Sequence, residues 1–356
     1  MLHVALAGLL AVPLALTPPD DTGDDKKSAA DKATTETVAT PGVFELNPVE
    51  EPEAITLDTY AMGRTSADIP LKLWAQYAWG TAADIYTPNN DVDRIRLGAP
   101  LPGSEAEVVS QRIAVGGQIN FVNLSRFAVG VGAQLGLAKN ELNFDNDAGP
   151  IGGGNLESDF GLQQVKVYGT ARGRVVGIHG GYAFDLGSEQ EFAEIPGTGG
   201  LQFPTNLSNS DGRDAIFVGA DFDYPSDRFR LLGGIDYYSL AEGEDDFGDA
   251  ITGGDFLNYA FGLGVRFPVF ELGAVLQIQT RFDEPTLENV GTVSGLGSHI
   301  GTVVPYLRFS PPSFPASIYV KGATPDEYLE FGAPIGGQNS VQPGLGFTAG
   351  LSIGFE

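Results

Sequence analysis

The stretch from Gly344 to Phe355 alternates strictly between apolar and small side chains. Apolar residues occupy every odd position from Leu345 to Phe355, and Gly, Thr or Ser occupies every even position. A period of two over this length predicts a strand with one apolar face and one small, polar face. Such a strand suits a wall that contacts lipid on one side only.

Similar alternation recurs upstream, beginning at Ile69. The further predicted strands cover 69–79, 108–121, 126–138, 161–172, 175–185, 215–224, 228–238, 256–267, 270–282, 299–309 and 316–322. Short turns of a few residues alternate along the chain with long loops of roughly 16 to 28 residues, as an up-and-down barrel requires. Pro305 conflicts with this pattern, because a central strand uses the N–H that proline lacks.

We therefore predict an all-β fold, a closed antiparallel up-and-down transmembrane β-barrel over residues 67–356. Twelve strands fit the pattern best, and ten or fourteen are the alternatives. A soluble β-sandwich would also alternate, but its long loops would not fall at one end only. Aromatic residues flank both kinds of connection, for example Phe127 and Tyr224 beside short turns and Tyr77 and Tyr237 towards the long loops. This distribution predicts two aromatic girdles at the membrane interfaces.

The first part of the chain differs in composition from the rest. Residues 1–17 are predicted to be a signal peptide, because a short apolar stretch ends before Thr17-Pro18-Pro19. Residues 18–66 are rich in charge and poor in apolar side chains, which predicts a disordered acidic periplasmic leader. In the alternative interpretation, residues 43–57 enter the barrel mouth as a plug.

The terminal strand also resembles the C-terminal assembly signal of Gram-negative outer-membrane β-barrel proteins. Thr348, Gly350, Ile353 and Phe355 match that signal in register, whereas Glu356 departs from it because the aromatic residue is usually terminal. The resemblance implies insertion by the barrel-assembly machinery and contact with outer-membrane lipid and lipopolysaccharide. It is porin-like in general character and indicates no particular family.

Charge is distributed unevenly between the loops and the strands. The net charge is −26, which argues against a nucleic-acid partner, and the acids concentrate in the long loops. The segments Asp145-Asn146-Asp147 and 242–249 offer clustered oxygen ligands, so divalent cations are possible partners at these loops. The alternative is a solvated, repulsive surface, since neither segment has EF-hand spacing.

Charged residues within the strands fall mainly on the small, polar face. A base on the lipid face costs about 2–4 kcal/mol at the bilayer midplane, so this face is predicted to line the lumen. The predicted lumen and selectivity residues are Lys72, Arg112, Lys166, Arg230, Arg266, Arg281, Lys321, Asp221, Asp223, Asp236 and Glu271. They either surround a water-filled channel or neutralise one another in a closed interior. Inward glycines such as Gly116, Gly132 and Gly264 favour the channel.

The resulting hypothesis is a porin-like outer-membrane channel for small hydrophilic solutes, with an acidic extracellular vestibule and a basic lumen. Its long loops would be extracellular and both termini periplasmic. The alternative is a non-conducting surface barrel whose acidic loops bind partners or divalent cations. No enzymatic activity, cofactor or protein-held metal site is expected. His179 and Ser298-His299 lack the His–Ser spacing of the twelve-stranded outer-membrane phospholipases, and no cysteine is present.

Overall fold

The computed structural model describes most of the predicted barrel. The described residues are 70–82, 84–86, 92–94, 105–124, 127–145, 153–173, 175–188, 191–194, 202–204, 209, 212–244, 250–282, 286–287, 291–292, 299–309, 316–323, 341–342 and 346–355. The predicted signal peptide, leader and plug segment lie outside them. Within these ranges, no helix has the length and apolar character needed to cross a bilayer.

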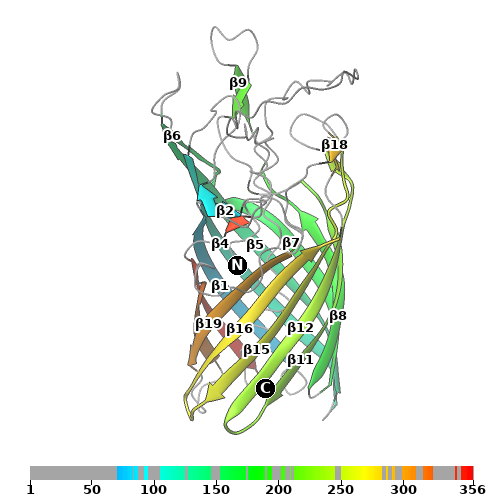
Figure 1. Ribbon diagram of the computed structural model, residues 1–356. Coiled ribbons are helices and arrows are strands. Elements are labelled where there is room, and N and C mark those ends of the chain that lie inside the picture. Colours follow the sequence, from blue (N-terminus) through cyan, green and yellow to red (C-terminus); the bar gives the residue numbers. More distant parts are fainter. Residues whose placement is uncertain are drawn as a thin grey trace, which may run out of the picture.

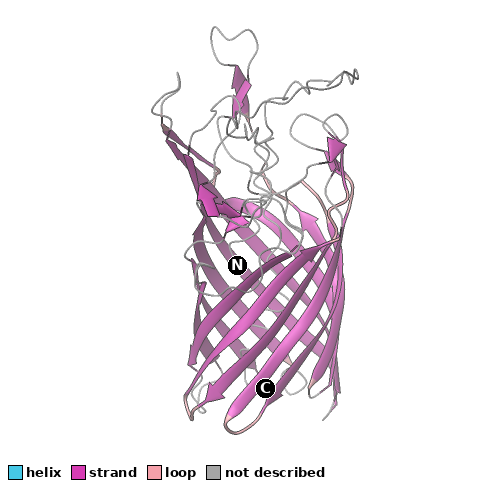
Figure 2. Cartoon of the chain, in the orientation of Figure 1, coloured by secondary structure: helices cyan, strands magenta, loops and turns pink. Residues whose placement is uncertain are grey.

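Thirteen strands form one antiparallel, up-and-down sheet, which curls with strongly tilted strands in Figure 1 and Figure 2. They are β1 (Leu71–Ala82), β4 (Glu105–Leu124), β5 (Phe127–Asp145), β6 (Gly154–Glu157), β7 (Gly161–Gly173), β8 (Val176–Asp185), β11 (Ala215–Pro225), β12 (Phe229–Leu240), β15 (Phe256–Arg266), β16 (Phe270–Arg281), β19 (His299–Phe309), β20 (Ala316–Ala323) and β22 (Gly346–Phe355). All except the short β6 correspond to strands predicted from the alternation. The all-β, antiparallel fold class is confirmed.

The strands pair in chain order, and the pairing returns to where it began. Neighbours pair from β4 and β5 through to β20 and β22, apart from the short strands in the loops. The last strand, β22, then pairs with β1, and β1 pairs with β4. The first and last of the predicted strands are therefore neighbours, with Leu71 opposite Phe355 and Gly80 opposite Gly346.

The long connections contain short strands that the alternation did not predict. These are β2 (Asp84–Tyr86), β3 (Val92–Arg94), β9 (Phe192–Glu194), β10 (Gln202–Pro204), β13 (Gly243–Glu244), β14 (Ala250–Thr252), β17 (Thr286–Leu287), β18 (Gly291–Thr292) and β21 (Val341–Gln342). They pair only with one another, and the pairs β2–β21 and β14–β17 join different loops. Runs of two or three residues are too short to show a period, so the sequence pattern missed them.

The polarity of the sheet is the reverse of that in a soluble domain. Large apolar side chains are exposed on the outer face, among them Phe121 at 64% and Ile216 at 60%. Charged side chains are buried on the inner face, and Arg230 and Asp236 are both 0% exposed. An exposed apolar surface of this extent requires a cover, and around a sheet with a polar interior that cover is lipid.

Strand β5 runs well beyond its predicted end at residue 138. Its outward side chains are apolar from Phe127 to Leu137 and polar from Lys139 to Asp145, while Leu142 and Phe144 are buried on the inner face. The polarity of the two faces therefore reverses within one continuous strand. Its apolar portion is consistent with the ~9–11 residues that a tilted strand needs to cross a bilayer. The alternation predicted where lipid contact ends, not where the strand ends.

Pro305 lies in β19 without breaking it. It is opposite Ala274 of β16, and the described pairs between β19 and β20 run only from Tyr306 to Phe309. Proline is tolerated in a strand where a ladder ends. The conflict seen in the sequence is thus confined to the end of the β19–β20 ladder.

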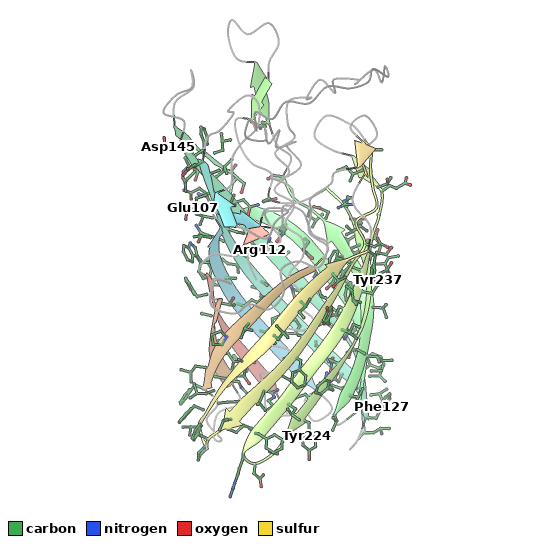
Figure 3. All side chains as sticks on the ribbon, viewed as in Figure 1. Glu107, Arg112, Phe127, Asp145, Tyr224 and Tyr237 are labelled. Carbon is green, nitrogen blue, oxygen red and sulfur yellow. The ribbon has the colours of Figure 1, made fainter. Side chains whose placement is uncertain are left out.

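Aromatic residues mark both ends of the apolar outer face. Phe127 and Tyr224 lie at the short-turn end and Tyr237 lies towards the long loops (Figure 3). Near the long loops, the Tyr182 hydroxyl donates to Asp214 at 2.8 Å and the Tyr237 hydroxyl donates to Asp255 at 2.5 Å. These rings contact the apolar band while their hydroxyls reach polar groups, which is the arrangement of aromatic residues at a membrane interface.

Candidate functional site

The predicted lumen residues lie on the inner face wherever their side chains are described. Lys72, Arg112, Lys166, Arg230, Asp221, Asp223, Asp236 and Glu271 are buried, and the Arg266 side chain is 31% exposed. The side chains of Arg281 and Lys321 lie outside the described residues. The structure thus gives the positions of these groups, and their role in selectivity stays a prediction.

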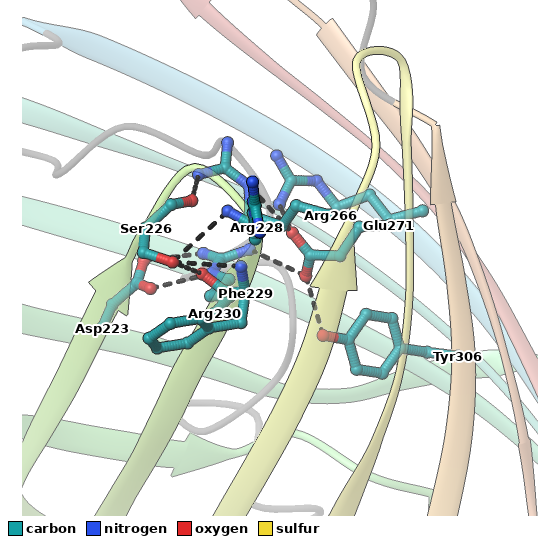
Figure 4. A network of polar contacts seen from close by, with 9 residues as sticks. Asp223, Ser226, Arg228, Phe229, Arg230, Arg266, Glu271 and Tyr306 are labelled. Carbon is teal, nitrogen blue, oxygen red and sulfur yellow. Dashed lines mark hydrogen bonds and ion pairs between the residues drawn. The ribbon is translucent and has the colours of Figure 1, made fainter.

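A first group of charges, the Glu271 cluster, lies at the short-turn end of β11–β19 (Figure 4). Arg230 donates two hydrogen bonds to the Asp223 carboxylate, from Nε at 2.7 Å and from Nη2 at 2.6 Å. Glu271 accepts from the Tyr306 hydroxyl at 2.7 Å and from Arg308 Nη1 at 3.5 Å. Its carboxylate oxygens also lie 3.6 Å from Arg230 Nη1 and from Arg266 Nε. The cluster places three guanidinium groups around two carboxylates.

A second group, the His179 cluster, lies farther along the interior on β7, β8, β11 and β12. Arg172 Nη1 is 2.5 Å from Asp221 Oδ1. His179 contacts Asp236 through Nε2, and its Nδ1 is 3.6 Å from Asp221 Oδ2. His179 therefore lies between two carboxylates, each of which faces one of its ring nitrogens.

A stack of aromatic rings lies beside the His179 cluster. Tyr238 stacks on Phe256 at 4.7 Å and on Phe217 at 5.5 Å between ring centroids. The Lys166 ammonium lies 5.2 Å from the Tyr238 centroid and 5.8 Å from that of Phe217. A cation over such ring faces is stabilised electrostatically, most of all when it is removed from water. Lys166 of β7 thereby contacts β12, three strands away in the sheet.

Inward glycines allow several of these contacts to pass over an intervening strand. Arg172 of β7 reaches Asp221 of β11 across Gly177 of β8, where a Cβ atom would lie 2.8 Å from Arg172 Nη1 and 3.0 Å from Asp221 Oδ1. Gly219 of β11 likewise lies beneath the contact between His179 and Asp236. Glycine is the only residue without the Cβ that would obstruct these pairs.

The sequence pattern was interpreted as open space at the inward glycines, but neighbouring side chains fill the space at several of them. Atoms of Trp74 occupy the position that a Cβ on Gly116 would take, and Tyr168 does the same at Gly132. At Gly264 the obstructing atom is the Tyr306 hydroxyl. Large side chains of neighbouring strands fill these positions, so glycine content is not evidence for an open lumen.

The two sides of the interior differ in their charge. The strands from β7 to β19 carry the Glu271 and His179 clusters and form the ionic wall, whereas β22, β1, β4 and β5 form a second wall. Its described inward charges are Lys72 and Arg112, and most other polar groups there are neutral. Examples are the Gln118 amide, which donates to Asn120 at 2.9 Å, and the Ser110 hydroxyl, which donates to Asn140 at 3.0 Å. Small side chains such as Thr348 and Ser352 continue this surface on β22. The interior is therefore asymmetric, with ion pairs concentrated on one side.

The predicted site set omitted several members of the two clusters. Arg172, Arg308 and Tyr306 were not singled out, and no partner was predicted for His179. A signal was present, because these arginines and Tyr306 occupy the even, inward positions of their runs. The partners themselves were not predictable from alternation, since it does not give the stagger that places two residues at the same level on strands two apart.

The described residues contain no group of three His, Asp or Glu residues arranged to hold a metal ion. Of the acidic loop segments proposed from the sequence to bind divalent cations, Asp145 and residues 242–244 are described, and the rest lie outside the described ranges. Cation binding by these loops stays a prediction.

The fold can be compared with those of known proteins. No protein-family model matches the chain, and no curated protein matches it. An outer membrane channel from Pseudomonas putida F1 superposes with a TM-score of 0.58 at 8% identity, over 81% of this chain and 96% of that chain. The transport unit of the autotransporter AIDA-I from Escherichia coli has a TM-score of 0.47 at 11% identity, over 80% of this chain and 90% of that chain. A FadL homologue from Pseudomonas aeruginosa has a TM-score of 0.38 at 10% identity, over 82% of this chain and 94% of that chain.

Only the first of these similarities is close enough to support an argument, and at this identity it concerns the fold alone. It shows that the chain has the fold of outer-membrane β-barrel proteins. The resemblance noted in the terminal strand is thereby confirmed at the level of the fold.

Proposed function

We propose that the protein is a channel of the outer membrane, a closed barrel of twelve strands that conducts small hydrophilic solutes. The observation that carries this proposal is the reversed polarity of the sheet, with aliphatic residues exposed outside and charged residues buried inside. The long loops would face the cell exterior and both termini the periplasm. Thr348, Gly350, Ile353 and Phe355 of β22 would serve as the signal for the barrel-assembly machinery.

The pairing of the strands supports closure. Each of the twelve long strands has a partner on both sides, because β4 pairs with both β1 and β5. An open sheet edge would leave N–H and C=O groups without partners in lipid, which costs several kcal/mol for each group. A circuit of twelve strands is the arrangement that avoids this cost.

The asymmetry of the interior supports a narrow, polar passage rather than a wide pore. Ion pairs and aromatic rings occupy the β7–β19 side. The β22–β5 side carries mainly amides, hydroxyls and glycines, which offer hydrogen bonds, and its described inward charges are Lys72 and Arg112. Hydrophilic solutes would pass mainly along this second wall, and the ion-paired wall would face the passage where it is partly exposed, at Arg266.

A second candidate function is a non-conducting surface barrel. The observation in its favour is the complete burial of Arg230 and Asp236, which shows that part of the interior is packed. In that case the charges neutralise one another across the interior, and the acidic loops would bind partners or divalent cations. The two candidate functions differ in whether the wall formed by β22, β1, β4 and β5 borders a continuous passage.

Planar-bilayer recording of the purified, folded protein distinguishes the two. We expect discrete conductance steps from the wild type. Gln76→Trp adds bulk on the inner face of β1 and is expected to lower the step size. Ala75→Trp adds the same bulk on the exposed outer face and is expected to leave it unchanged. Absence of steps from protein that shows a heat-modifiable electrophoretic shift would support the non-conducting barrel.

A further inference from the structure

The Glu271 cluster contains more hydrogen-bond donors than acceptors. Each oxygen of Asp223 accepts a hydrogen bond from one nitrogen of Arg230. Glu271 is shared by Tyr306 and three arginines, at distances between 2.7 and 3.6 Å. A guanidinium group presents five N–H donors, so two carboxylates cannot satisfy three such groups. The cluster has a surplus of positive charge and of donors.

Two of the surplus donors are identifiable atoms. Arg230 Nη1 and Arg308 Nε are buried and lack a hydrogen-bond partner in the described part of the chain. Both arginines are almost entirely removed from solvent, at 0% and 2% exposure. Buried donors are normally satisfied, and an exception in a polar cluster indicates a missing acceptor.

Arg266 extends this surplus towards the short-turn end of the strands. Its Nη1 donates to the Ser226 carbonyl at 2.7 Å, which fixes the guanidinium beside the β11–β12 turn (Figure 4). The side chain remains 31% exposed. Arg228 is its cross-strand neighbour, since Arg266 N donates to Arg228 O at 2.8 Å, and Arg228 is exposed as well. Two cations directly opposite each other repel, and Asp227 in the same turn offsets only part of this charge.

We propose that the Glu271 cluster is a subsite for small oxyanions, with Arg266 as the residue that contacts the solute. Carboxylates and phosphates match the planar fork of a guanidinium group and supply the acceptors that the cluster lacks. Arg230 and Arg308 act as positioning residues that keep the local charge positive. The subsite rests on the proposed function, because a solute reaches it only through an open passage.

The first test is the reversal potential of single channels in a KCl gradient. The wild type is expected to prefer chloride over potassium. Arg266→Gln should reduce this preference, whereas Arg266→Lys, which keeps the charge, should retain most of it. Lys139→Gln removes the same charge from the outer face of β5, where Lys139 pairs with Glu157 at 2.5 Å, and should change nothing.

The second test uses inorganic phosphate as the probe. Phosphate added to the chloride solution is expected to reduce the chloride current through the wild type, and several-fold less through Arg266→Gln. A cation-selective wild type, or equal shifts for Arg266→Gln and Lys139→Gln, would overturn the subsite. A wild type without conductance would instead reject the channel itself. The wild-type recordings decide between these outcomes even if Arg266→Gln does not fold.

Discussion

Replacing Arg230 with methionine is expected to destabilise the folded protein by about 3–5 kcal/mol, the cost of breaking a buried ion pair on one side. Arg230 is fully buried and donates both hydrogen bonds that neutralise Asp223. Without it, the buried Asp223 carboxylate loses the partner of both its hydrogen bonds, and Glu271 loses one of its neighbouring cations. The main contribution is therefore the uncompensated Asp223 carboxylate.

Equilibrium unfolding from lipid vesicles in guanidinium chloride measures this effect. Arg228→Met removes an equivalent charge from an exposed position two residues away and should change the unfolding free energy by less than about 0.5 kcal/mol. Adding Asp223→Leu to Arg230→Met should recover part of the loss, because the orphaned carboxylate is then removed. If Arg230→Met alone were as stable as the wild type, Asp223 and Arg230 would not be a buried pair.

Replacing Val131 with arginine is expected to lower the free energy of unfolding by about 2–4 kcal/mol, the cost of a cation on the lipid face near the bilayer midplane. Val131 lies within the apolar outer run of β5 and is exposed. Arginine is readily tolerated at an exposed position that faces water. The size of the cost therefore reports directly on whether this face meets hydrocarbon.

The matched control lies on the same strand and the same face. Asn143 is also outward on β5, beyond the reversal of polarity at Lys139. Asn143→Arg should cost no more than about 0–1 kcal/mol, the range found near or beyond the membrane interface. Equal costs at the two positions would contradict the placement of the membrane along β5.

The alternation of side chains predicted the strands well because lipid contact imposes a strict period of two on one face. It placed on the inner face the predicted lumen residues whose side chains are described, from Lys72 in β1 to Glu271 in β16. The prediction stopped short in β5, where the outward residues become polar while the strand continues. A pattern created by the membrane cannot be followed outside it.

The arrangement of the candidate site was less predictable than its membership. Arg172 pairs with Asp221, and His179 with Asp236, across an intervening strand that carries a glycine at the crossing. Such pairs depend on the stagger of the strands and on which positions lack a Cβ. The glycines were interpreted from the sequence as space for solutes, whereas Gly116, Gly132 and Gly264 make space for neighbouring side chains.

The concentration of ion pairs on one wall gives the two sides of the interior different roles. The Asp223–Arg230 and Arg172–Asp221 pairs tie β7, β11 and β12 together and are expected to be rigid. Solute passage is more compatible with the wall of β22, β1, β4 and β5, which carries fewer charges. Arg266 lies at the short-turn end, where it is only partly covered by the ionic wall.

The central claim, an exterior in lipid around a polar interior, is tested most directly by a spin-label scan along β5. The chain has no cysteine, so single cysteines can be labelled without removing native ones. In vesicles, labels at Val131, Ala133 and Leu135 should collide frequently with oxygen and rarely with a water-soluble nickel complex. Labels at Glu141 and Asn143 should show the opposite preference. Strong collision with the nickel complex at Val131, Ala133 and Leu135 would show that this face meets water and would contradict the account.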